Sequence, residues 1–171
     1  MAMTLQEISD ILTSNGFNHS YDKEDKIIFA KGTSSGESLA LFIRLNEDGE
    51  FFDMSSRLMD GDEFLNTKGT KHLQVLMAYL LQRNFDTKFG TWEYNSEDGT
   101  ISFAVEIPLE DNNLTAKQLK RITGIMISAG DEAKNIKHIL AKGSLPLEGD
   151  EAAKKIAELE AMLAQLQGSG I

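Results

Sequence analysis

Hydrophobic and polar residues alternate over residues 38–45 and again over residues 101–107. A period of two places successive side chains on opposite faces of a sheet, so both runs predict strands with one apolar face. The residues between the apolar ones are predicted to point away from the core: Phe42, Arg44, Ala104 and Glu106.

Turn signals join these runs into hairpins. Asp98 and Gly99 separate two β-rich runs, and glycine accepts a positive φ without a Cβ clash. Pro108 should end the second strand. Four earlier strands are expected, over residues 17–21, 26–31, 38–45 and 50–58. A polar loop at 32–36 separates the second from the third, and a polar connection at 60–67 follows the fourth.

Capping patterns mark two helix starts. A capping box is predicted at Thr4 and Glu7, and another at Thr115 and Gln118. In this motif each side chain accepts a hydrogen bond from the backbone N–H of the other residue. The second helix continues as an apolar seam with steps of three and four residues: Leu119, Ile122, Met126, Ala129, Ala133, Ile136 and Leu140. Gly130 can split it, and we favour one continuous, kinked helix.

A helix predicted over residues 70–85 has more apolar residues than a one-sided surface helix needs. It should therefore contact two apolar neighbours, one being the sheet and the other a second subunit. Its candidate dimer or partner surface consists of Leu73, Leu76, Met77 and Leu80.

The C-terminal part has its own pattern. Residues 1–142 form the main domain, residues 143–149 a linker with Pro146, and residues 150–171 an amphipathic helix. Three roles stay open for its apolar stripe: folding back, pairing with a second copy or engaging a partner. The stripe residues are Ile156, Leu159, Leu163 and Leu166.

The order of elements predicts an α+β fold: helix, four strands, helix, two strands, helix, helix. Without regular βαβ alternation, this order favours a mostly antiparallel sheet of about five to six strands with helices on one face. A chain of 171 residues is long enough for one such domain with an appendage.

Charge and composition narrow the function. The formal charge is −10, from 27 acidic and 17 basic residues, which disfavours a nucleic-acid partner. There is no cysteine, which excludes disulfides and thiol chemistry. No apolar run reaches the ~20 residues of a membrane helix and no signal pattern opens the chain, so we expect no membrane partner and a cytoplasmic location.

No set of residues predicts catalysis, a metal or a cofactor. Gly32 and Gly36 bracket a loop without the lysine of a phosphate-binding motif, and the three histidines are scattered. Trp92 and Tyr94 share one strand face, where core packing is favoured over a ligand platform.

Three stretches resemble the YbjN-type domains of bacteria: GFNHSYDKEDKIIFAKG, LFIRLNEDGEFFDM and FDTKFGTWEYNSEDGTISFAVEIPLEDNNLTAKQL. The resemblance covers roughly residues 5–140 and leaves out the last helix. It implies a fold like that of type III secretion chaperones, which are small, acidic dimers that bind other polypeptides. It brings no active-site residue.

The leading hypothesis is a non-enzymatic protein-binding module, chaperone-like or regulatory, that acts as a cytoplasmic homodimer with an unidentified polypeptide partner. One alternative is a small-ligand sensor or enzyme with a pocket near Trp92 and Tyr94. The other is a structural domain that self-assembles through the last helix.

Overall fold

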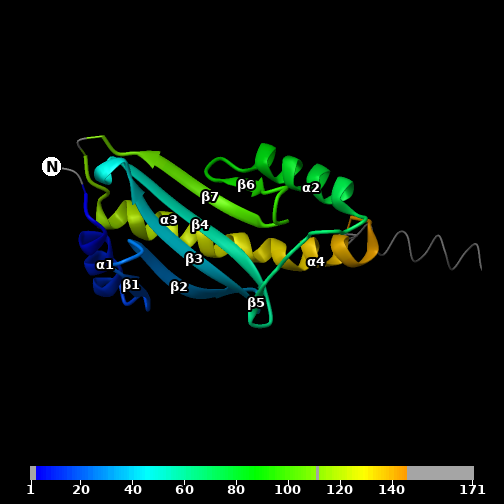
Figure 1. Cartoon of the computed structure of the whole chain (residues 1–171), viewed down its shortest axis with the longest axis horizontal. Helices are drawn as coiled ribbons and strands as arrows, with labels where there is room; N and C mark the ends of the chain where they lie inside the picture. Colours follow the sequence, from blue (N-terminus) through cyan, green and yellow to red (C-terminus); the bar gives the residue numbers. More distant parts are fainter. Residues whose placement is uncertain (1–2, 111, 146–171) are drawn as a thin grey trace, which may run out of the picture.

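An antiparallel sheet with helices on one of its faces forms the centre of the molecule (Figure 1). The structure is a computed structural model that describes residues 3–110 and 112–145. The helices are α1 (Leu5–Ser14), α2 (Leu73–Asp86), α3 (Ala116–Ser128) and α4 (Ala133–Lys142), with 3-10 turns η1 (Glu47–Gly49) and η2 (Ala129–Glu132). The strands are β1 (Ser20–Asp22), β2 (Ile27–Ser34), β3 (Glu37–Asn46), β4 (Phe51–Asp60), β5 (Glu63–Phe64), β6 (Thr91–Tyr94) and β7 (Ile101–Pro108).

The strands follow the order β1-β2-β3-β4-β7-β6, with β5 paired to the end of β4. Every pair is antiparallel. β4 is central because it pairs with β3 on one side, where Ser56 faces Leu41, and with β7 on the other, where Ser56 faces Phe103. The predicted α+β class with a mostly antiparallel sheet is confirmed, and the described residues form seven strands rather than the expected five to six.

The core lies between one sheet face and the helices α1, α3 and α4, which Figure 1 shows on the same side of the sheet. The predicted alternation is confirmed, since most of the apolar positions of β3 and β7 are buried. Both capping boxes form as predicted, at Thr4 and at Thr115. The largest fully buried side chains of the core are Ile8, Ile28, Leu39, Leu41, Ile43, Phe52, Met54, Leu58, Leu76, Leu119, Met126 and Ile136.

α3, η2 and α4 form one rod across the sheet. Its backbone stays in the right-handed helical region at Ser128 and Ala133, but the predicted continuous helix is interrupted around Gly130 by a 3-10 turn. At Gly130 the rod approaches the sheet closely: a Cβ there would lie 2.7 Å from Leu39 Cδ2 and 3.0 Å from Ser34 Cβ. Glycine is the residue that permits this approach.

Polar contacts fix the rod against the hairpin of β2 and β3. The hydroxyls of Ser34 and Ser35 each donate a hydrogen bond of 2.6 Å to Asp131 Oδ1. These bonds hold the pKa of the Asp131 carboxyl below its usual value. Further along the rod, Lys137 Nζ lies 2.7 Å from Glu37 Oε2.

Two predicted loops are shorter than expected. Residues 32–34 belong to β2, because they pair with the start of β3 across a tight turn at Ser35 and Gly36. Within the predicted connection at 60–67, Glu63 and Phe64 form β5. Both segments are polar, so their hydrophobic pattern does not predict the strands that backbone pairing forms there.

Replacing Gly130 with valine should destabilise the fold. The added side chain must push against Leu39 and Ser34, and overpacking of this kind costs about 1–3 kcal/mol of unfolding free energy. Urea denaturation followed by circular dichroism measures this change. Gly124→Val on α3 is the matched control, because a Cβ at Gly124 would meet no atom of the described residues within 4 Å. Equal stability of the two variants would contradict the close approach.

Candidate functional site

The face of the sheet opposite the helices is not covered by any other element of the described residues. Its side chains form rows across the strands, and one row runs from Phe29 through Phe42, Ser55 and Ala104 to Thr91. The orientation predicted for Phe42, Arg44, Ala104 and Glu106 is confirmed by this register.

One half of this open face is aromatic and basic. The ring centroids of Phe29 and Phe42 are 5.3 Å apart, and those of Phe42 and Phe64 are 5.9 Å apart. The Arg57 guanidinium lies 5.3 Å from the Phe42 centroid and 5.7 Å from the Phe64 centroid. Arg44 lies 6.0 Å from Phe42. We call these five residues the Phe42 platform.

The other half of the open face is acidic. It carries Asp53 on β4, Glu106 on β7 and Glu93 on β6. Partial burial raises the pKa of Asp53 and that of Glu93, and the neighbouring carboxylates raise both further. Arg44 lowers the pKa of Asp53 in part, over a distance of 3.9 Å. The open face therefore has a cationic and an anionic half.

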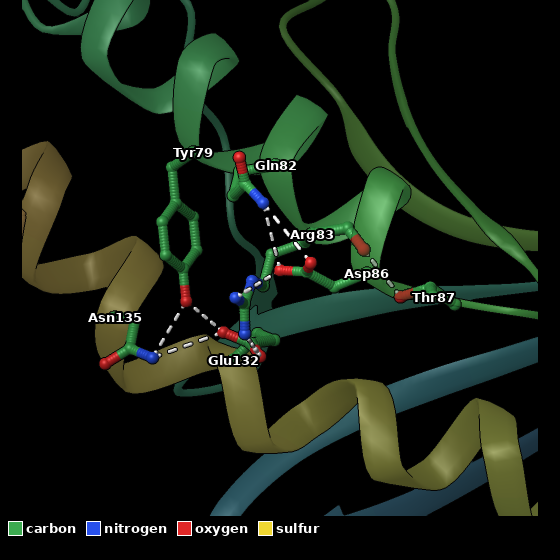
Figure 2. A network of polar contacts seen from close by, with 7 residues as sticks. All are labelled: Tyr79, Gln82, Arg83, Asp86, Thr87, Glu132 and Asn135. Carbon is green, nitrogen blue, oxygen red and sulfur yellow. Dashed lines mark hydrogen bonds and ion pairs between the residues drawn. The ribbon is translucent and has the colours of Figure 1, made fainter.

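A second surface lies on α2, which packs against β6 and α4. Figure 2 shows how Tyr79 reaches from α2 to the rod, where its hydroxyl donates a hydrogen bond to Glu132. Asn135 Nδ2 donates to the Tyr79 oxygen over 2.8 Å. Arg83 Nη1 lies 3.6 Å from Glu132 Oε1, and Arg83 Nη2 lies 2.8 Å from Asp86 Oδ2.

The predicted surface residues of α2 divide between its two sides. Leu76 and Leu80 are 0% and 4% exposed and belong to the core of the same chain, while Leu73 and Met77 are half-buried. The large apolar side chains that α2 exposes are those of Leu81 and Phe85, at 69% and 85%. Together with Met77 they follow a spacing of four residues, and we call these three residues the α2 stripe.

Trp92 does not form a ligand platform. Its side chain is 6% exposed and its ring lies 5.3 Å from that of Phe103, which agrees with the predicted core packing. Asn84 holds the backbone of this residue, accepting from Trp92 N over 2.7 Å and donating to Trp92 O over 3.0 Å. Gly90 is required here, because a Cβ would lie 2.3 Å from the Phe103 ring.

The open face has shallow hollows at two of its edges. One, of about 410 Å³, lies where the loop after α2 meets β6 and β7, and includes Glu93 and Glu106 in its wall. The other, of about 280 Å³, lies beside the turn after β4 and includes Lys31 and Asp62. Across residues 3–110 and 112–145, no group of three or more histidine, aspartate or glutamate side chains is placed to hold a metal.

The predicted residues of the last helix, Ile156, Leu159, Leu163 and Leu166, lie outside the described residues. The partner role of Phe42 and Arg44 stays a prediction. Sequence reasoning did not assign a surface role to Phe29, Arg57, Phe64, Leu81 or Phe85. Alternation along residues 51–59 places Arg57 on the face of Phe42, whereas Phe64 lies in a two-residue strand that has no such signal.

A family model described as "Putative bacterial sensory transduction regulator", named YbjN, matches residues 4–135. The chain belongs to the YbjN family. The predicted resemblance is thus confirmed, and residues 150–171 of this YbjN-family protein lie outside the matched range, as expected. None of the curated proteins compared with the chain matches it.

A solved structure with a similar fold is that of the HopA1-SchA chaperone-effector complex. The matched chain has 15% sequence identity and a TM-score of 0.47, and the alignment covers 71% of this chain and 85% of that one. Within the part of the chain that the structure describes, no helix is long and apolar enough to cross a bilayer.

The Tyr79 network yields a pH-dependent prediction. Burial raises the pKa of Tyr79 from the usual 10.0 to about 12, and the hydrogen bond to Glu132 adds to this. The folded state therefore prefers the protonated phenol, so this contribution to stability is complete below pH 10.0 and is lost as the pH rises towards 12.

Tyr79→Phe should lower the free energy of unfolding by about 1 kcal/mol at neutral pH, because it removes the hydrogen bond to Glu132. The difference from the parent should shrink between pH 10.0 and about 12. A titration followed by tyrosinate absorbance checks that Tyr79 is the group with the raised pKa, since Tyr79→Phe should lack the rise in absorbance near pH 12. Tyr21→Phe, outside the network, should retain it, and loss of the late change in both variants would contradict the assignment.

Proposed function

We propose that this YbjN-family protein is a non-enzymatic protein-binding module, chaperone-like or regulatory, that acts as a homodimer in the cytoplasm. The observation that carries this proposal is the exposure of Leu81 and Phe85 on α2. Large apolar side chains that share one helix face and remain exposed are typical of protein interaction sites.

The α2 stripe suits contact with a second copy. Its three residues lie on one side of a straight element, so a two-fold axis across the helix would bring identical stripes together. Burial of each leucine or phenylalanine side chain from water is worth about 1.5–3 kcal/mol. A helix held in place before association also loses little conformational freedom on binding.

That rigidity comes from the other side of α2. Leu76 and Leu80 are buried in the core, and Tyr79 and Arg83 contact Glu132 on the rod. These contacts set the rotation of the helix about its axis, so that Leu81 and Phe85 face outward. The description of the family as a regulator of sensory transduction supports a role in binding other proteins.

The double variant Leu81→Ser/Phe85→Ser tests the proposal by native mass spectrometry. The parent should have twice the mass of one chain and the variant the mass of one chain, because the variant lacks the apolar contact. Its thermal unfolding at low concentration should be unchanged, since both side chains are exposed.

Leu145→Ser makes the same kind of change at another exposed leucine, which is 56% exposed, and should leave the dimer intact. A parent that stays a single chain at every concentration would overturn the homodimer. A parent dimer that survives the double variant would remove α2 as its interface.

A further inference from the structure

Arg57 has an unusual environment on the open face. Its guanidinium lies over two phenyl rings, and no carboxylate of the described residues lies within 4.0 Å of it. Its Nε is buried and finds no hydrogen-bond acceptor among the described residues. Arg83 also has an unpaired Nε, but its terminal nitrogens pair with Asp86 and Glu132.

Nε itself has no accessible surface, so an arriving carboxylate can bind only the terminal nitrogens of the Arg57 guanidinium, which pair with no carboxylate of the described residues. A guanidinium is planar, and two of its parallel N–H groups can donate to the two oxygens of one carboxylate. The rings of Phe42 and Phe64 restrict access of water to Arg57, which strengthens such a charge-assisted bond. The chemistry of this position therefore favours a carboxylate.

The surroundings of Arg57 favour a carboxylate that is flanked by apolar groups. Phe29, Phe42 and Phe64 form a continuous row of rings, and Phe64 is 45% exposed. Aromatic residues and arginine are the residue types enriched at the centres of protein interfaces. A free metabolite anion would contact Arg57 but leave most of this row exposed.

The acidic half of the open face determines how a bound segment would be oriented. Glu93 lies on β6, two strands from Arg57 on β4, which is roughly 10 Å at the usual spacing between strands. Glu93 and Glu106 repel a carboxylate there and attract a cation. A bound segment is thereby oriented with its acidic residue at Arg57 and a basic residue towards β6.

We propose that the Phe42 platform binds a polypeptide segment of a partner protein in which an acidic side chain is flanked by apolar side chains. Arg57 receives the carboxylate, and the three phenyl rings contact the apolar neighbours. This inference goes beyond the proposed function, because it assigns a second surface and the chemistry of its partner.

The test uses the full-length protein labelled with nitrogen-15 and two peptide pools. The first pool is acetyl-Lys-X-Glu-X-Lys-amide, with X being Leu, Ile, Phe or Tyr, and the second has Gln in place of Glu. The acidic pool should shift the Arg57 Nε–H resonance and the amides of Phe42 and Ser55. The Gln pool should bind at least about tenfold more weakly, because a hydrogen bond to a neutral group is weaker.

Three variants assign the effect to Arg57. Arg57→Gln should weaken binding of the acidic pool at least about tenfold, and Arg57→Lys should lose part of the affinity, because it keeps the charge but not the planar fork. Arg121→Gln is the matched control, since Arg121 is an exposed residue of α3, in the helical layer. Leu81→Ser/Phe85→Ser should bind the acidic pool normally, which separates this test from that of the homodimer.

Several results would overturn the proposal. These are equal binding of the two pools, shifts confined to another surface, and the absence of binding by either pool at millimolar concentration. A shift of the same amides with protein concentration alone would assign the open face to a second copy instead. An unchanged affinity in Arg57→Gln would show that the rings alone carry the contact.

Discussion

The close approach of the rod α3–η2–α4 to one face of the sheet is the constraint on which the rest of the structure depends. It is possible because Gly130 has no side chain between the rod and Leu39. The rod and α1 cover the same side of the sheet, so most of the large buried side chains of the central strands face that side. No element of the described residues covers the opposite face, where Phe42 and Arg57 remain partly accessible.

The rod also determines what α2 presents to its surroundings. Tyr79 and Arg83 contact Glu132, at the end of the 3-10 turn, and thereby fix one side of α2 towards the rod. The remaining side must then expose Leu81 and Phe85, whose burial would stabilise an assembly but not the single chain. The same contacts that stabilise the fold thus leave an apolar surface free.

Much of this fold is encoded locally and could be predicted. Alternation assigned the buried residues of β3 and β7, and the capping boxes at Thr4 and Thr115 marked two helix starts, because these signals involve neighbours in the sequence. The inward side of α2 could not be predicted, because it depends on Glu132, 53 residues away from Tyr79. β5 was missed for a different reason, since it is only two residues long and only two backbone pairs with β4 define it.

The charge of the chain limits how the Phe42 platform can act. A net charge of −10 opposes the approach of an acidic partner, although at physiological salt this repulsion is screened beyond about 8 Å. Arg57 therefore acts at contact, where the phenyl rings exclude water, and contributes to specificity more than to the rate of association. The acidic half of the face complements this, because Glu93 and Glu106 attract the basic residues of a mixed-charge segment. A partner that carries both charges is thus favoured over a purely acidic one.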